Sequence, residues 1–207
     1  MKSITSIATM SFLSVFSLFV ARRTQDKNEI TRQPRYSEVV ERAFQFSQEI
    51  PAEFKGIEYK VVVRYLPSSN WPESQLVFLA DSNHAIRLIE YRLKQDTRPI
   101  SEVYDETLRR NPNATTDDIL KRISIEKLER VGGDSAKRQV DQLFTLSIPT
   151  NVSRDLCMDG TTYELWVLTP SNKIHASFSD CSYGRKTASI PIMQWLKTTR
   201  MAFLGHK

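Results

Sequence analysis

The sequence predicts an α+β fold built on a mainly antiparallel sheet. Three strand-like runs, over residues 57–66, 75–81 and 84–94, follow one another with short connections, which is typical of an antiparallel meander. A helical middle comes next, and a β-hairpin followed by a helix ends the chain. Because strands and helices do not alternate in a repeating β-α-β order, a parallel sheet is not expected.

The N-terminal part of the domain is expected to be a helix followed by the meander. A helix is predicted over residues 37–48, with Ser37 as a possible N-cap and Ile50–Pro51 as its end. Residues 84–94 alternate apolar with charged side chains near their end, as a strand with one buried face does. The run over 57–66 alternates in the same way, with one side formed by Ile57, Tyr59, Val61, Val63 and Tyr65.

The middle of the chain is expected to be mostly helical. Ser101 is placed to cap a helix over residues 102–110, and Thr115 is placed to cap a second helix over 116–123. Residues 124–131 are ambiguous, and we interpret them as a weak strand.

Gly132–Gly133 is a clear break in the pattern, after which a helix is predicted. That helix begins at Asp134 or Ser135 and runs to about residue 146. Its inward side chains are expected to be Ala136, Val140, Leu143 and Phe144.

The C-terminal unit is predicted to be a hairpin of strands 161–168 and 173–180, followed by a helix over 190–204. The strands are joined by Thr169-Pro170-Ser171-Asn172, in which proline suits the second position of a type I turn. This turn sets a register in which Trp166 faces His175, Glu164 faces Ser177 and Thr162 faces Ser179. One face is then apolar and the other mostly polar, so we interpret the polar face as exposed to solvent.

Residues 1–21 are predicted to be a signal peptide or an N-terminal membrane anchor. The run over 3–21 carries no charge, follows Lys2 and ends at Arg22–Arg23. Phe19 is large for a typical cleavage site, so removal of the segment and a permanent membrane association both stay open. Residues 22–34 are predicted to be a flexible linker, and 35–207 a single α+β domain. The expected location is therefore secreted or periplasmic, or tethered to a membrane.

The two cysteines, Cys157 and Cys181, are expected to form a disulfide if the protein is exported. The bend at Asp159–Gly160 would let them meet, and two free thiols are the alternative. Two cysteines with no histidine at ligand spacing do not predict a metal site, and no cofactor motif is present in the sequence.

The charge pattern does not indicate a nucleic-acid partner. The formal net charge is +5, and the basic residues are interleaved with acidic ones instead of forming a one-sided stripe. Asn113 and Asn151 lie in glycosylation sequons, which matter only in a eukaryotic secretory pathway.

The alternating row of His175, Ser177, Ser179 and Cys181 raises the question of an active site. A hydrolase would use His175 as base with Ser177 or Cys181 as nucleophile, but successive positions on one strand face lie ~7 Å apart. No third group is placed to orient the histidine, and no G-x-S-x-G motif is present. We therefore favour a solvated strand face.

The favoured function is an exported, non-catalytic binding or accessory protein, with the hydrolase as the alternative. A binding surface for a protein or a small molecule is predicted around Trp166 and His175. Arg185 and Lys186, just before the last helix, could receive an anion near its N-terminus.

Overall fold

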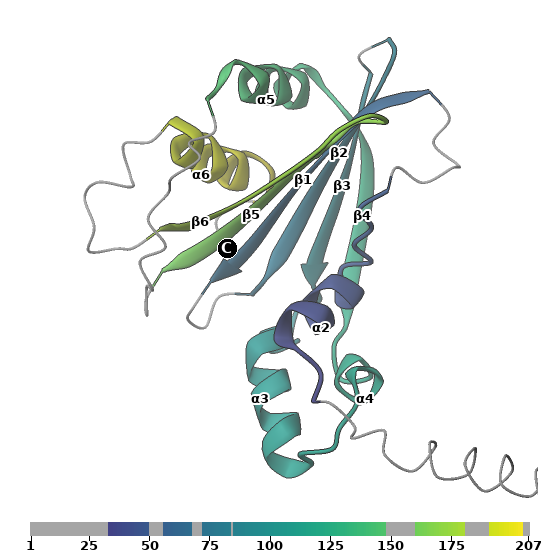
Figure 1. Cartoon of the computed structure of the whole chain (residues 1–207), viewed down its shortest axis with the longest axis vertical. Helices are drawn as coiled ribbons and strands as arrows, with labels where there is room; N and C mark the ends of the chain where they lie inside the picture. The colour runs from purple at the N-terminus through teal and green to yellow at the C-terminus, as the bar shows by residue number, and fades with distance from the viewer. Residues whose placement is uncertain are drawn as a thin grey trace, which may run out of the picture.

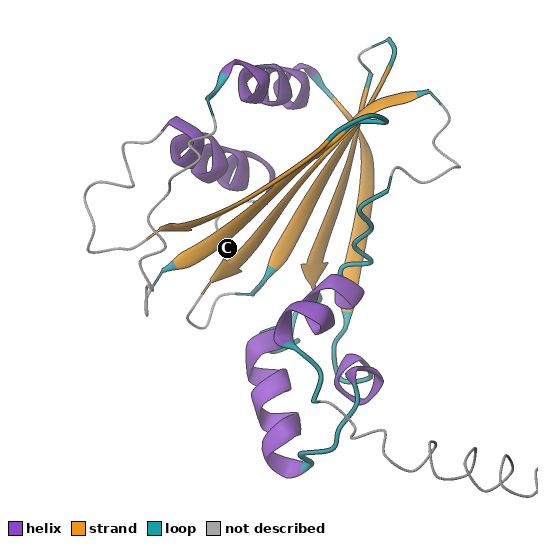
Figure 2. Ribbon diagram, in the orientation of Figure 1, coloured by secondary structure: helices purple, strands orange, loops and turns teal. Residues whose placement is uncertain are grey.

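A single six-stranded antiparallel sheet organises the domain, as Figures 1 and 2 show. The computed structural model describes residues 33–49, 56–67, 72–83, 85–147, 160–180 and 191–204. The strands are β1 (Ile57–Pro67), β2 (Ser74–Asp81), β3 (Ile86–Leu93), β4 (Ile125–Gly132), β5 (Thr161–Leu168) and β6 (Lys173–Asp180). The helices are α2 (Tyr36–Ala43), α3 (Ile100–Arg110), α4 (Thr116–Leu120), α5 (Asp134–Thr145) and α6 (Pro191–Leu204). The predicted α+β class with an antiparallel sheet is confirmed.

The strand order is β4-β3-β2-β1-β5-β6, so the N-terminal meander and the C-terminal hairpin join along β1. The meander is as predicted, and the weak strand becomes its fourth member, β4. The hairpin also has the predicted register, with Trp166 opposite His175 and Glu164 opposite Ser177. The pairing of β1 with β5, which runs from Lys60 opposite Leu168 to Pro67 opposite Thr161, was not predicted.

Helices α5 and α6 cover one face of the sheet, which we call the first face (Figure 1). Side chains at alternate strand positions meet the two helices there, as the period of two along a strand requires. The strand residues of this core are Val61, Val63, Tyr65, Leu76, Phe78, Ala80, Ile86, Leu88, Tyr163, Leu165, Val167 and Phe178. Of the predicted inward residues of α5, Phe144 is 51% exposed and only packs edge-on against Tyr59, so that prediction was wrong.

The opposite, second face of the sheet carries a separate core beneath α2, α3 and α4. Its strand residues are Val62, Val77, Leu79, Ile89, Tyr91, Leu93, Trp166 and Leu168. The prediction of a solvated hairpin face was therefore wrong for β5, where Trp166 is 4% exposed. It was correct for His175 and Ser177 on β6, which are exposed. The helices bury β5, whereas β6 is the outermost strand.

Helices α2 and α4 both end earlier than predicted, and the N-cap of α2 is Arg35 instead of Ser37. Helix α2 ends at Ala43 instead of residue 48, because Gln45 adopts a left-handed φ of 50° that turns the chain. Helix α4 begins at Thr116 with Thr115 as its N-cap, as predicted, and Thr115 and Asp118 form a reciprocal capping box, but the helix ends at Leu120. The chain therefore leaves α2 as an irregular segment over 44–49.

Helix α3 begins at Ile100, and the predicted cap by Ser101 is wrong. Its free amides are satisfied instead by Glu73, which precedes β2. The Glu73 carboxylate accepts hydrogen bonds from the Ile100 amide at 2.8 Å and from the Ser101 amide at 2.9 Å. It also accepts one from the Tyr36 hydroxyl at 2.7 Å, and burial together with this carboxylate raises the pKa of Tyr36. Glu73 therefore ties α2 and α3 to the sheet.

The connection between β4 and α5 favours a glycine at position 132. A Cβ atom at Gly132 would come within 3.0 Å of Ala136 Cβ and of Ile86 Cγ2 and carbonyl oxygen. Such contacts are tighter than nine in ten real Cβ contacts, so a larger residue would require Ala136 or Ile86 to move by a few tenths of an ångström. The predicted break at Gly132–Gly133 thus reflects a close approach of strand and helix.

Replacing Glu73 by glutamine is expected to lower the free energy of unfolding by about 2 kcal/mol, because an amide group cannot accept all three hydrogen bonds. Urea denaturation followed by circular dichroism measures this loss. The matched control is Glu102→Gln in the exposed first turn of α3, with an expected loss under about 1 kcal/mol. Equal losses in the two variants would contradict the capping role of Glu73.

Candidate functional site

A groove of about 170 Å³ opens on the second face of the sheet, between the segment after α2 and strands β1 to β4. Six of its lining residues are apolar or aromatic and five are polar, and of the polar ones Lys60 and Gln75 are buried. The lining residues are Gln45, Phe46, Ser47, Lys60, Val62, Gln75, Val77, Leu79, Ile89, Tyr91 and Lys127.

The groove exists because α2 is short. Eight residues of helix cannot cover the second face, and the segment over 44–49 completes the cover as irregular chain. Phe46 in this segment packs toward β5, with its ring centroid 4.5 Å from that of Trp166. The apolar side chains of Val77 and Ile89, farther toward β4, therefore line an open space.

Lys60 of β1 holds the segment that roofs the groove. Its ammonium Nζ donates to the carbonyl oxygen of Ser47 at 2.8 Å and to that of Glu49 at 3.1 Å. The residue is only 6% exposed, and burial lowers the pKa of Lys60. Because β1 supplies the donor and the segment over 44–49 supplies the acceptors, these hydrogen bonds hold the segment against the sheet.

A buried arginine, Arg64, orders the other end of the groove. Its Nε and Nη2 both donate to Gln75 Oε1 at 3.2 Å, and its Nη1 donates to Glu164 Oε2 at 2.9 Å. Its guanidinium lies 4.8 Å from the Phe46 ring centroid and 4.7 Å from that of Trp166. Burial lowers the pKa of Arg64, and Glu164 partly opposes that effect. The cluster fixes Phe46 and Gln75, which both line the groove.

The predicted binding surface is only partly described. Trp166 is buried, and its ring stacks on that of His175 with centroids 4.6 Å apart and planes inclined by 5°. The tryptophan thus contributes to the second core, next to Phe46 of the groove. Arg185 and Lys186 lie outside the described residues, as do Cys157 and Cys181 of the expected disulfide.

The alternating row on β6 is not assembled as a catalytic site in the described structure. His175 and Ser177 are both exposed, and the imidazole packs flat against Trp166. Within the part of the chain that the structure describes, no carboxylate or amide hydrogen-bonds to the imidazole to orient it. General base catalysis needs such contacts with both nucleophile and orienting group.

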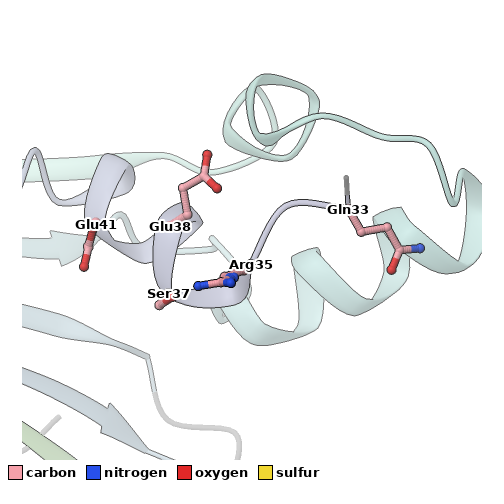
Figure 3. Close-up of a pocket in the computed structure, with 5 residues that line it drawn as sticks. All are labelled: Gln33, Arg35, Ser37, Glu38 and Glu41. Atoms are coloured by element: carbon pink, nitrogen blue, oxygen red, sulfur yellow. The ribbon is translucent and has the colours of Figure 1, made fainter. Parts of the chain in front are cut away.

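A wider hollow of about 440 Å³ lies at the start of α2 and is lined by Gln33, Arg35, Ser37, Glu38 and Glu41. Figure 3 shows that these side chains spread along the helix and the segment before it instead of pointing at one centre. Glu38 is also engaged, because its carboxylate accepts a hydrogen bond from Thr116 Oγ1 at 2.9 Å. The hollow therefore lacks the convergent groups and apolar walls of a binding site.

Sequence reasoning missed the groove because its polar residues come from different strands. Lys60, Gln75 and Lys127 belong to β1, β2 and β4, which are separated in sequence. One signal was available: Lys60 and Arg64 interrupt an otherwise apolar strand, and buried cations in such a position need partners.

The comparisons with family models, with curated proteins and with solved structures find no match to this chain. In the described ranges, no group of three or more histidine, cysteine, aspartate or glutamate side chains is arranged to hold a metal ion. Of the helices described, none is both long and apolar enough to cross a membrane.

A further buried ionisable group, Glu90, lies on the first face, away from the groove. It is 4% exposed, and its Oε1 accepts no hydrogen bond, although Arg92 Nη1 lies 3.6 Å away. The Arg92 guanidinium is directed to Glu126 instead, with Nε donating to Oε2 at 2.9 Å. Burial raises the pKa of Glu90, and the charges of Arg92 and Arg130 only partly offset this effect.

Glu90→Gln is expected to stabilise the protein at pH 7 by about 1 kcal/mol, because the folded state disfavours the charged carboxylate. The folded-state pKa of Glu90 lies above its unfolded-state value of about 4.3. As the pH rises from the unfolded-state pKa to the folded-state pKa, the free energy of unfolding of the native chain falls, and it stays low at higher pH. The gain should therefore disappear below about pH 4.

Urea denaturation of both proteins at pH 7 and at low pH measures the difference. Glu58→Gln, at an exposed position of β1, is the control and should change stability little at either pH. A Glu90→Gln variant that is less stable than the native chain at pH 7 would contradict this account.

Proposed function

We propose that this chain is a non-catalytic binding protein whose groove on the second face takes a small amphipathic anion. The observation that carries the proposal is the combination of apolar walls with lysine side chains at one open groove. Small-molecule sites combine apolar walls with placed polar groups, and this groove has six apolar or aromatic lining residues beside five polar ones.

The shape of the groove supports a small, partly apolar ligand. Its floor consists of Val62, Val77, Leu79, Ile89 and Tyr91. Its volume of about 170 Å³ is below the roughly 300–1,000 Å³ typical of sites for drug-sized molecules. A short acyl chain or a single ring is therefore the apolar part that we expect.

The charge at the rim supports an anionic head group. The side chain of Lys127 is 45% exposed, and its Nζ forms an ion pair with Glu129 Oε2 at 3.7 Å, a separation longer than a hydrogen bond. Its donors thus remain available to a carboxylate or a phosphate. Lys60, whose Nζ already donates to two carbonyl oxygens, adds positive charge beneath the roof of the groove.

The groove has no arrangement that favours catalysis. Its titratable side chains are Lys60, Tyr91 and Lys127, and no described lining residue supplies a carboxylate or an imidazole as an acid–base partner. The alternative, an exported hydrolase, would need His175 beside a nucleophile. The imidazole stacks on Trp166 instead, and Cys181 lies outside the described residues.

Hexanoate is expected to bind the groove and to shift the NMR methyl signals of Val62, Val77, Leu79 and Ile89, whereas hexan-1-ol binds more weakly because it lacks the charge. Lys127→Gln should weaken hexanoate binding about tenfold, the scale of one charged hydrogen bond, and leave hexan-1-ol binding unchanged.

Lys173→Gln, which removes the same charge from exposed β6, is the matched control and should bind both probes as the native chain does. Hexanoate shifts confined to surfaces away from the groove would contradict the proposal. Equal loss of hexanoate binding in the two lysine variants would contradict a specific role for Lys127.

We further propose that the protein is exported, with residues 1–21 as a signal peptide or membrane anchor. The support is the uncharged run over 3–21 between Lys2 and Arg22–Arg23, which lies outside the described residues. The domain would then meet its ligand outside the cytoplasm.

Mass spectrometry of the protein recovered from its native cells tests export. A mature N-terminus at or near Arg22 in the soluble exported fraction supports cleavage, and an intact N-terminus in the membrane fraction supports the anchor. An intact N-terminus in the cytoplasmic fraction would contradict both forms of the proposal.

A further inference from the structure

Strand β4 is one of the two edges of the sheet, and no other strand of the described residues pairs with its outer side. The strand order places β4 and β6 at the edges. Residues 127–131 of β4 are all exposed, and Val131 is 85% exposed. An open edge presents unpaired backbone N–H and C=O groups, which a further strand can satisfy.

The hydrogen-bond pattern identifies which residues of β4 present these groups. The Lys94 amide donates to the Ser124 carbonyl at 2.9 Å, and the two residues continue the register that sets Leu93 opposite Ile125. Hydrogen-bonded pairs recur at every second position of an antiparallel ladder. Residues 126, 128 and 130 therefore bond to β3, whereas 125, 127, 129 and 131 direct their backbone groups outward.

This alternation restricts how β4 can pair with β4 of a second molecule. In an antiparallel pair of β4 strands, each residue that directs its backbone groups outward must lie opposite another such residue. The twofold axis must therefore pass through a residue position and not between two positions. An axis at Glu126, Lys127, Glu129 or Arg130 would set two like charges directly opposite each other, which is destabilising. Among the five central positions of β4, Leu128 alone is uncharged.

We propose that β4 pairs antiparallel with β4 of a second copy of this chain, about a twofold axis at Leu128. In this register Glu126 faces Arg130 of the second copy, and Lys127 faces its Glu129. Ile125 faces Val131, and the two Leu128 side chains face each other. Every opposite pair is thus either oppositely charged or apolar, and symmetry repeats each one.

The apolar contacts use side chains that the isolated chain leaves exposed. Val131 is 85% exposed and Leu128 is 37% exposed. A pair about Leu128 covers both, and the outward N–H and C=O groups of 125, 127, 129 and 131 gain partners. This assembly goes beyond the proposed function because it involves the edge of the sheet, although Lys127 of this edge also lines the groove.

The other edge lacks this self-complementarity. The Thr169 amide donates to the Asn172 carbonyl at 2.8 Å, so Lys173 directs its backbone outward while Asp180 bonds to β5. The two charged residues of β6 therefore cannot face each other in an antiparallel pair of β6 strands. Asp180 is also engaged with Lys197 at 2.7 Å.

The test compares the mass of the full-length chain with that of three variants by sedimentation equilibrium. Arg130→Glu places one glutamate opposite Glu126 at each of the two symmetric positions, so we expect the dimer to dissociate about 10-fold to 100-fold more readily. The double variant E126R/R130E restores opposite charges and is expected to recover most of the dimer. Lys173→Glu, with the same charge change on β6, is expected to dimerise as the native chain does.

Three results would overturn the proposal, provided that circular dichroism shows the variants folded. A native chain that stays monomeric at high concentration excludes the dimer. Self-association that does not respond to Arg130→Glu, such as one driven by residues 3–21, excludes β4 as the interface. Failure of the double variant to recover association excludes the register about Leu128. The mass measurement uses no ligand, and all three variants keep Lys127, so failure of the dimer is distinguished from failure of the groove proposal.

Discussion

The pairing of β1 with β5 is the interaction on which the rest of the structure depends. It joins the N-terminal meander to the C-terminal hairpin, and the two would otherwise be separate small sheets, each with little core. Both faces of this central pair are buried, with Val63 and Leu165 beneath α6 and Val62 and Trp166 in the second core. Residues roughly a hundred positions apart must meet to form it, as the bond between Arg64 and Glu164 illustrates.

Arg64 is the clearest consequence of that pairing. A guanidinium in the middle of a doubly buried strand is costly unless its donors are satisfied. Its partners come from the strands on either side, Gln75 on β2 and Glu164 on β5, while Phe46 and Trp166 cover its plane. The groove lies beside this cluster, so the buried Arg64 guanidinium also positions Phe46 and Gln75 of the candidate site.

Much of the fold could be predicted because its determinants are local. The hairpin register follows from four turn residues, and Thr115 caps α4 because its partner Asp118 is three residues away. Two of the incorrect predictions involve distant partners. Trp166 was assigned to solvent because the polar residues of β6 suggested a wet face, whereas α2 and Phe46 cover β5. Ser101 was assigned as a cap, whereas Glu73, which is 28 residues earlier, supplies the acceptor. The groove combines four strands and an irregular segment, so no single stretch of sequence carries its signal.

The close contact at Gly132 has a consequence for the behaviour of β4. Because the backbone there lies close to Ala136 and Ile86, the last residue of β4 packs tightly against α5 and β3. Edge strands that dock another chain usually lose conformational freedom when they do so, and this loss weakens binding. Here the helix has already removed that freedom during folding. The entropic cost of ordering this end of β4 thus belongs to the folding of the monomer, and a strand that pairs with β4 there meets an ordered backbone.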